Sequence, residues 1–109
     1  MARGLTRGDV RMVRFAPPNK QRPVVVLTRT SALGFLNQVI VAPITSTIRG
    51  IPTEIVLDVG DGLKKRCAMN LDHVASVPKA QLGKLLATLS PERLDEACQA
   101  LEFALGCDT

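Results

Sequence analysis

The stretch Arg22-Pro23-Val24-Val25-Val26-Leu27-Thr28 decides the fold class of this chain. A continuous run of β-branched residues is typical of a strand that is buried on both faces. Pro23 is acceptable there because it stands at the start of the run. The segment Gln38-Val39-Ile40-Val41-Ala42-Pro43-Ile44-Thr45 has the same character and predicts a second strongly hydrophobic strand.

Shorter segments on either side of this pair predict further strands over residues 9–15, 53–58, 67–70, 73–77 and 84–89. A single helix follows near the end of the chain, with Ser90 as its N-cap, Pro91 in its first turn and Gly106 as its stop. Many short strands punctuated by Gly and Pro, followed by one late helix, indicate a small barrel or half-barrel capped by helices.

The late helix has an apolar stripe and a polar reverse face. Helical spacing predicts that the stripe faces the core, and its members are Leu94, Ala97, Cys98, Leu101 and Leu105. The reverse face is acidic and polar, which is typical of a solvated surface, although a partner site is the alternative; it consists of Glu92, Asp95, Glu96, Gln99 and Glu102.

Length and composition narrow the function classes. The 109 residues suit one domain, taken as residues 1–109, and the 46% hydrophobic content is enough for a buried core. No apolar run approaches the roughly 20 residues of a membrane helix, and residues 1–9 lack an apolar signal segment. We therefore expect a cytoplasmic protein without a membrane partner.

The cysteines and the histidine are too few and too scattered for several kinds of site. Cys67, Cys98 and Cys107 form no CxxC pair, and an odd count disfavours a disulfide framework. With His73 as the single histidine, a zinc site and a two-histidine acid–base pair are both disfavoured. His73 falls in the predicted strand 73–77, where a structural role is favoured over a catalytic one.

Charge is distributed unevenly along the chain. Residues 1–66 hold 11 basic and 4 acidic side chains (+7), and residues 67–109 hold 3 basic and 6 acidic ones (−3). A basic first part indicates a polyanion partner, although a solvated surface is the alternative. The chain has three Phe and no Trp or Tyr, so it has few aromatic side chains on which bases could stack. Recognition of a nucleic acid would therefore depend on charge, hydrogen bonds and the planar guanidinium groups of arginine.

Two polar clusters adjoin the hydrophobic strands. The first cluster is Asn19-Lys20-Gln21-Arg22-Pro23, at the start of a buried strand. The planar guanidinium of its Arg suits two phosphate oxygens, and the alternative is that this Arg covers one end of the barrel. The second, Pro43-Ile44-Thr45-Ser46-Thr47, offers three hydroxyls that either cap a turn or donate to negative charge developing on a phosphoryl group.

Common catalytic motifs are missing from the sequence. GxSxG, HExxH, GxxxxGK[ST] and GxGxxG do not occur. Asp58 and Asp61 flank a turn without the further carboxylates that a magnesium site usually recruits. A metal-dependent nuclease is therefore disfavoured, and we expect neither a metal nor a cofactor.

The ordered motifs resemble the MazF/PemK family of bacterial toxin endoribonucleases. In this family an R-P-[VA]-[VL]-V strand corresponds to Arg22–Val26, and a V-x-P-[IV]-T-[ST] segment corresponds to Val41–Ser46. Gly8-Asp9-Val10 looks like the opening strand, Gly50–Ile55 like the G-x-x-x-E-V continuation, and Cys67–Val74 occupies the region of the family's L-D-Q-[IV]-like strand. The resemblance covers nearly the whole chain.

The resemblance implies a fold, an activity and partners. The fold would be mainly β with α, a compact SH3-like barrel of the CcdB/PemK type with short helices and a C-terminal helix. The active form would be a homodimer that is held by a small acidic antitoxin. The activity would be metal-independent, sequence-specific cleavage of single-stranded RNA by the ribose 2′-hydroxyl, leaving a 2′,3′-cyclic phosphate and a 5′-hydroxyl.

Site residues follow from the same resemblance. Arg22 and Thr45 match the catalytic Arg and Thr, with Ser46 and Gln21 as supporting residues. The candidates for RNA contacts are Asn19, Lys20, Thr47, Arg49, Lys64 and Lys65. The run Lys64-Lys65-Arg66 is otherwise a solvated loop. The first predicted strand lacks the family's usual Trp, and the loop over residues 16–21 is short and has no acidic residue, so the target sequence does not follow from the resemblance.

Two other functions compete with this one. The first is a non-enzymatic toxin of the CcdB type that inhibits a protein such as gyrase, which the same barrel could support because fold does not fix function. The second is a nucleic-acid-binding module without turnover.

Overall fold

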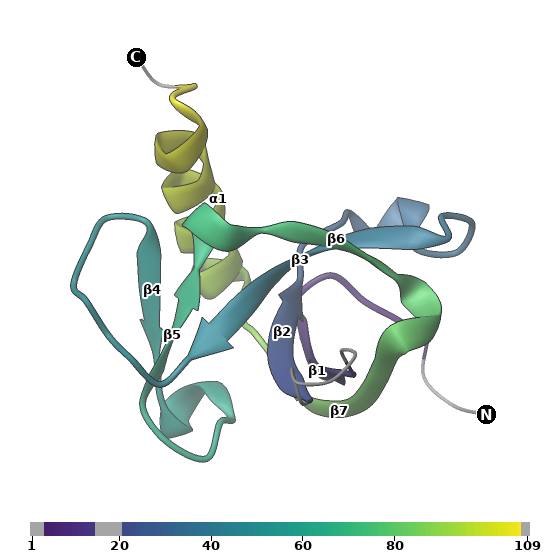
Figure 1. Ribbon diagram of the computed structural model, residues 1–109, viewed down its shortest axis with the longest axis horizontal. Helices are drawn as coiled ribbons and strands as arrows, with labels where there is room; N and C mark the ends of the chain where they lie inside the picture. Colours follow the sequence, from purple (N-terminus) through teal and green to yellow (C-terminus); the bar gives the residue numbers. More distant parts are fainter. Residues whose placement is uncertain (1–3, 15–20, 108–109) are drawn as a thin grey trace.

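The computed structural model describes residues 4–14 and 21–107. Its seven strands are β1 (Asp9–Val13), β2 (Arg22–Val26), β3 (Gln38–Thr45), β4 (Glu54–Leu57), β5 (Cys67–Asn70), β6 (Ala75–Pro78) and β7 (Leu82–Thr88), followed by the helix α1 (Pro91–Leu105) (Figure 1). Short 3₁₀ turns connect them: η1 (Thr30–Ala32), η2 (Val59–Asp61), η3 (Leu71–His73) and η4 (Lys79–Gln81).

All strand pairs are antiparallel, and the sheet runs in the order β4-β5-β3-β2-β1-β7 with β6 also paired to β3. The predicted mainly β class with a C-terminal helix is confirmed. The sheet is not closed, because β4 and β7 end the order without pairing to each other within the described residues. The expected barrel is therefore an open, curved sheet.

Strand β3 is the organising element of this sheet. It pairs with β2 along one edge, and along the other it pairs with β6 through residues 38–41 and then with β5 through Ile44 and Thr45. Pro43 lies where β3 passes from β6 to β5. A Pro is tolerated at such an irregular position because it has no backbone N–H to contribute to a ladder.

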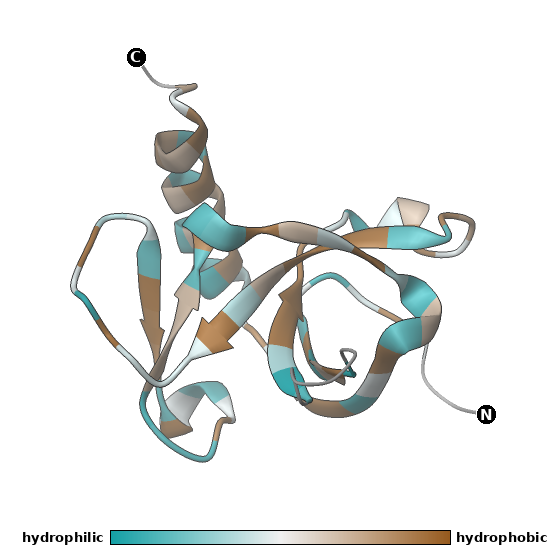
Figure 2. Ribbon diagram, in the orientation of Figure 1, coloured by the Kyte–Doolittle hydropathy of each residue, from teal (hydrophilic) through white to brown (hydrophobic). Residues whose placement is uncertain are grey.

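Strand β2 is buried on both faces from Val24 to Val26, as its sequence predicts, and β3 is mostly buried from Val41 to Ile44, whereas Gln38 and Ile40 of β3 are exposed. Val25 packs with Val10, Ala42 and Ile44 in one apolar cluster, whereas Val24 and the residues that share its face pack in a second one, which includes Val13, Val26, Val39 and Val41. Figure 2 shows this hydrophobic character along β2 and β3, in contrast to the hydrophilic loop that precedes β5. Both apolar clusters therefore include residues of β2 and of β3.

The helix α1 begins and ends as the sequence predicts. The Ser90 side-chain oxygen accepts a hydrogen bond from the backbone N–H of Arg93 at 3.2 Å, and Pro91 occupies the first turn. Gly106 adopts the left-handed conformation (φ 74°) that stops the helix.

The predicted apolar stripe of α1 is only partly correct. Ala97 is buried, and so is Ala100, whereas Cys98 is exposed and the Leu105 side chain is 67% exposed. Leu94 and Leu101 are half-buried. The C-terminal half of α1 extends away from the sheet (Figure 1), so no strand covers the last turns.

His73 does not lie in a strand, which corrects the prediction for residues 73–77. The Asn70 side-chain oxygen accepts a hydrogen bond from the backbone N–H of Asp72 at 2.8 Å and turns the chain into η3. His73 ends this 3₁₀ turn and is exposed, and β6 starts only at Ala75. None of the helices in the described ranges is long and apolar enough to cross a membrane.

Candidate active site

The pairing of β2 with β3 brings the two predicted polar clusters together. Val26 pairs with Val41, Val25 with Ala42 and Val24 with Pro43. The paired residues end at Val24 and Pro43, and Arg22 and Thr45 each stand two positions beyond this last pair on their strands.

Arg22 and Thr45 line one pocket of about 670 Å³. Its rim carries the four cationic residues Arg22, Lys64, Lys65 and Lys84, and the hydroxyl residues Thr45 and Ser46. Its remaining wall is mostly apolar and consists of Met12, Pro23, Ile44, Leu63, Cys67, Leu85 and Leu86, with Gly62 at the loop. No Asp or Glu is among the described residues that line it, so the pocket favours an anionic ligand.

The Arg22 side chain is exposed and available to a ligand. Its guanidinium forms no hydrogen bond or ion pair with any residue in the described part of the chain. Because β2 is stiffened by buried valines behind it, the start of this side chain is held in place while its charged end is free.

The Thr45 hydroxyl is oriented by the turn that follows it. Its oxygen accepts a hydrogen bond from the backbone N–H of Thr47 at 3.1 Å. This bond occupies a lone pair of the oxygen and leaves the hydroxyl proton free to be donated to a ligand.

The far end of the same loop is held by the buried carboxylate of Glu54. Its Oε1 accepts hydrogen bonds from the backbone N–H groups of Arg49 (2.9 Å) and Gly50 (3.1 Å). Gly50 has a φ of 70°, which favours glycine. Glu54 Oε2 is buried and has no hydrogen-bond partner in the described ranges. Glu54 therefore fixes the loop that runs from Thr45 to Gly50.

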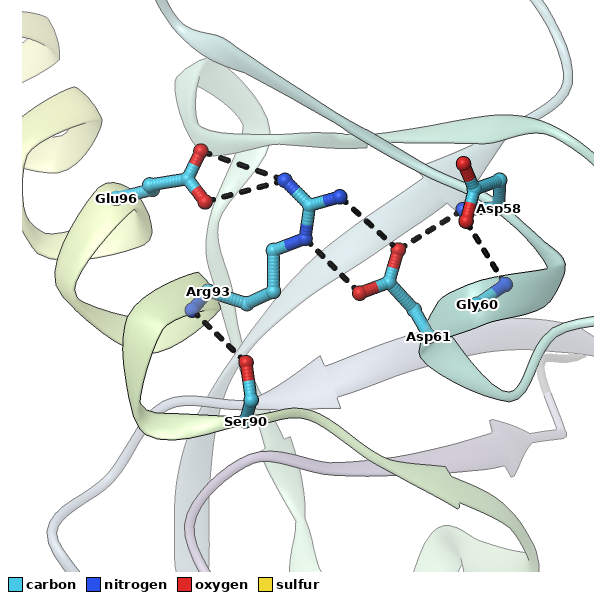
Figure 3. Close-up of polar contacts among 6 residues, drawn as sticks. All are labelled: Asp58, Gly60, Asp61, Ser90, Arg93 and Glu96. Atoms are coloured by element: carbon cyan, nitrogen blue, oxygen red, sulfur yellow. Dashed lines mark hydrogen bonds and ion pairs between the residues drawn. The ribbon is translucent and has the colours of Figure 1, made fainter.

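The loop that carries Lys64 and Lys65 is attached to α1 through an ion pair (Figure 3). Arg93 Nε donates to Asp61 Oδ1 at 2.9 Å, and Nη2 donates to Oδ2 at 3.3 Å. Asp61 also accepts the backbone N–H of Asp58 at 3.0 Å. Burial alone would raise the pKa of Asp61, but the bonds from Arg93 and from Asp58 hold that pKa below its ordinary value.

Cys67 lies in the wall of the pocket as a buried thiol. Burial raises its pKa, the negative charge of Asp61 raises it further, and Lys65 opposes this shift. A thiol with a raised pKa is a weak nucleophile at neutral pH, so this residue contributes packing rather than chemistry.

The other candidate residues divide into three groups. Ser46, Lys64 and Lys65 line the pocket. Gln21, Thr47 and Arg49 are exposed and are not among the residues that line it. Asn19 and Lys20 lie outside the described residues.

Sequence reasoning missed Lys84. The residue stands between Gly83 and Leu85 in a short predicted strand and gives no local signal of a site. Only the pairing of β7 with β1, which closes one side of the pocket, brings it near Arg22.

The described residues contain no group of three or more His, Cys, Asp or Glu side chains placed to hold a metal ion. The arrangement instead offers fixed positive charge and hydroxyl donors around a space lined by aliphatic side chains. Such groups have the charge and the hydrogen-bond donors that suit a phosphate group and that stabilise additional negative charge on it.

Comparison with known proteins identifies the family. Residues 6–105 match the family model described as the PemK-like, MazF-like toxin of type II toxin–antitoxin systems. The chain belongs to this family. The predicted MazF/PemK resemblance is thereby confirmed.

Individual MazF proteins agree with this assignment. The chain is 44% identical over 102 residues to the probable endoribonuclease MazF5 of Mycobacterium tuberculosis, covering 93% of each chain. It is 32% identical over 99 residues to endoribonuclease MazF3 of the same species, covering 91% of this chain and 96% of the relative.

Solved structures of MazF proteins share the fold. The Mycobacterium tuberculosis toxin MazF-mt6 aligns with a TM-score of 0.82 at 30% identity, covering 90% of this chain and 96% of that one. A mycobacterial endoribonuclease in complex with its cognate antitoxin aligns with a TM-score of 0.82 at 24% identity, covering 94% and 96%. The open sheet with a C-terminal helix is thus the MazF fold.

Proposed function

We propose that this chain is a sequence-specific endoribonuclease toxin that cleaves single-stranded RNA through the ribose 2′-hydroxyl. One observation carries the proposal: Arg22 and Thr45 line one pocket together with Lys64, Lys65 and Lys84. Relatives named endoribonucleases at up to 44% identity support the same activity.

The chemistry needs little from the protein beyond positioning and charge. The 2′-oxygen attacks the adjacent phosphorus and loses its proton, the bond from phosphorus to the 5′-oxygen breaks, and that oxygen takes up a proton. The products are a 2′,3′-cyclic phosphate and a 5′-hydroxyl. Because the RNA supplies the nucleophile, neither a Ser–His pair nor a metal ion is required.

Arg22 neutralises the charge that builds on the non-bridging oxygens of the phosphate. Arginine remains protonated in proteins, so it acts as a fixed electrostatic donor with a planar fork that matches two oxygens. Thr45 donates its free hydroxyl proton to the same group, and Ser46 stands next to it. Loss of one such preorganised donor costs about 10²- to 10³-fold in rate.

The remaining assignments belong to the same proposal. The cationic rim suits the acidic segment of a small antitoxin, which would compete with RNA for Lys64 and Lys65. We assign residues 1–109 to one toxin domain that acts as a homodimer in the cytoplasm. Similar solved structures include a mycobacterial endoribonuclease in complex with its cognate antitoxin and MazE–MazF from Deinococcus radiodurans, which supports such a partner.

The proposal is tested by incubating the purified protein with a long single-stranded RNA in excess EDTA. We expect discrete cleavage by the wild type, and a loss of about 10²-fold or more for Arg22→Ala and for Thr45→Val. The matched control is Arg29→Ala, which removes an exposed Arg that does not line the pocket. Intact RNA with the wild-type protein, or unchanged cleavage by Arg22→Ala, would overturn the proposal.

A further inference from the structure

Three consecutive residues of β7, namely Lys84, Leu85 and Leu86, line the pocket. In a regular strand successive side chains point to opposite faces, so three in a row do not share one site. The pairing of β7 with β1 explains the exception, because the register shifts twice between Val10 and Val13. Bulges of this kind redirect side chains and are frequent next to active sites. We call these three residues the β7 wall.

A glycine allows this irregular strand to lie close to its neighbour. A Cβ atom added at Gly83 would stand 3.2 Å from the backbone oxygen of Met12, which is tighter than an ordinary contact. The oxygen of Gly83 in turn accepts a hydrogen bond from Arg11 Nη1 at 3.2 Å. The β7 wall is therefore held against β1 by both packing and hydrogen bonding, although it lies in a strand at the end of the sheet order.

The β7 wall combines an aliphatic surface with a positive charge. Leu86 is 37% exposed, and it adds to the apolar side of the pocket that Met12, Pro23 and Leu63 form. Lys84 is exposed beside it. A ligand that satisfies both features has a flat apolar part and an anionic part a short distance away, which is the chemistry of a nucleotide.

The volume of the pocket also suits a nucleotide. About 670 Å³ lies within the range of small-molecule sites, and it exceeds what the reacting phosphate alone requires. The space beside Arg22 and Thr45 is thus available to a base next to the scissile bond. Because no aromatic residue lines it in the described part of the chain, aliphatic side chains would contact the base.

We propose that the β7 wall determines sequence specificity: Leu85 and Leu86 contact the base adjacent to the scissile phosphate, and Lys84 binds the next phosphate along the RNA. This inference rests on the proposed function and adds to it the residues that select the cleavage sequence. An acidic protein segment is the competing occupant. The protein segment is disfavoured because the aliphatic residues share one pocket with Arg22 and Thr45. In the proposed function the RNA must occupy that pocket in order to react.

The test compares Lys84→Ala and Leu86→Ser with the wild type on a randomised single-stranded RNA library. We expect Leu86→Ser to relax the preference at one nucleotide beside the cut by about threefold to tenfold. We expect Lys84→Ala to raise KM by a similar factor, to leave kcat within about twofold and to lower the salt dependence of binding by about one phosphate contact. Lys84→Arg should restore KM.

Two control variants distinguish an effect of the β7 wall from the effect of changing any exposed leucine or cation. Leu105→Ser changes a more exposed leucine at the C-terminal end of α1, and Arg29→Ala removes an exposed cation outside the pocket. Both should retain the wild-type sequence preference and KM. Thermal melting of each variant by circular dichroism shows that the fold is retained.

The outcomes distinguish this inference from the proposed function. Binding of a randomised, fully 2′-deoxy library, from which preferred sequences are selected by affinity, reports on the β7 wall without cleavage. If the wild type binds sequences from this library but cleaves no RNA, the proposed function fails, and weaker binding by Lys84→Ala still supports the role of the β7 wall. If both variants keep the wild-type preference and KM, the inference is wrong. It is also wrong if they lose only the inhibition by an acidic antitoxin, since the wall is then a protein-docking surface.

Discussion

Replacement of Arg93 by Ala tests whether α1 holds the loop that carries Lys64 and Lys65. Arg93 donates two hydrogen bonds to the Asp61 carboxylate, at 2.9 and 3.3 Å. The Asp61 side chain is 10% exposed and that of Arg93 is 29% exposed. The substitution leaves a largely buried carboxylate whose one remaining hydrogen-bond partner among the described residues is the backbone N–H of Asp58.

The magnitude follows from this geometry. Hydrogen bonds to charged groups contribute about 1.5–3 kcal/mol, but partial exposure of Arg93 and the bond that Asp61 retains reduce the loss. The contact of Arg93 with the exposed Glu96 adds close to nothing. We expect Arg93→Ala to lower the free energy of unfolding by about 2 kcal/mol, which lowers Tm by about 10 °C for a domain of this size.

The assay is thermal and urea unfolding followed by far-ultraviolet circular dichroism, because the chain has no Trp or Tyr for fluorescence. Gln99→Ala, on the exposed side of α1, is the control and should change stability by less than about 0.5 kcal/mol. In a double-mutant cycle with Asp61→Asn, the two losses should be strongly non-additive. Additive losses, or a loss below about 0.5 kcal/mol for Arg93→Ala, would refute this reasoning.

The same pair predicts a dependence on pH. Since the pKa of Asp61 is lower in the folded protein than in the unfolded chain, its contribution is complete above the ordinary carboxyl pKa of about 3.9. It is lost as the pH falls through the lower pKa of the folded state. The difference in stability between the wild type and Arg93→Ala should therefore be constant near neutral pH and shrink in acid.

Three further predictions follow from buried groups. Glu54→Ala should release the loop from Thr45 to Gly50 and lower the free energy of unfolding by about 1–3 kcal/mol, and Glu54→Gln should have an intermediate effect. The loss of stability is measured by thermal melting, and the effect of the released loop is measured as a change in kcat. Iodoacetamide should label Cys98 and Cys107 in the native protein but Cys67 only after denaturation, as peptide mass spectrometry would show, because Cys67 alone is buried and has a raised pKa. Gly8→Ala should cost about 1–2 kcal/mol in urea unfolding, because its φ is 94°.

Much of the sheet could be predicted because its strands carry local signals. The β-branched runs at β2 and β3 and the capping residues of α1 gave correct elements, and the motif order led to the correct family. The resemblance predicts that Arg22 and Thr45 act together, and the structure has both residues in the lining of one pocket, on the paired strands β2 and β3.

The failures concern features that depend on tertiary contacts. Lys84 reaches the pocket only because β7 shifts register against β1, and a strand pattern contains no sign of such a bulge. Cys98 and Leu105 have helical spacing but are exposed, because helical spacing alone does not show how much of a helix packs against the core. The strand predicted at His73 is wrong because the chain turns into η3 there, where the Asn70 side chain accepts a hydrogen bond from the backbone N–H of Asp72. Such a side-chain hydrogen bond does not change the pattern of hydrophobic residues from which strands are predicted.

The central claim is that the RNA supplies its own nucleophile while Arg22 and Thr45 stabilise the phosphate. The most direct measurement uses an RNA with one cleavage site and a single 2′-deoxy substitution in the nucleotide on the 5′ side of the cut. We predict that the parent RNA is cleaved in EDTA to a 2′,3′-cyclic phosphate and a 5′-hydroxyl, identified by mass spectrometry, and that the substituted RNA is bound but not cleaved. Cleavage of the substituted RNA at the same bond, or a 3′-hydroxyl product from the parent RNA, would contradict the account.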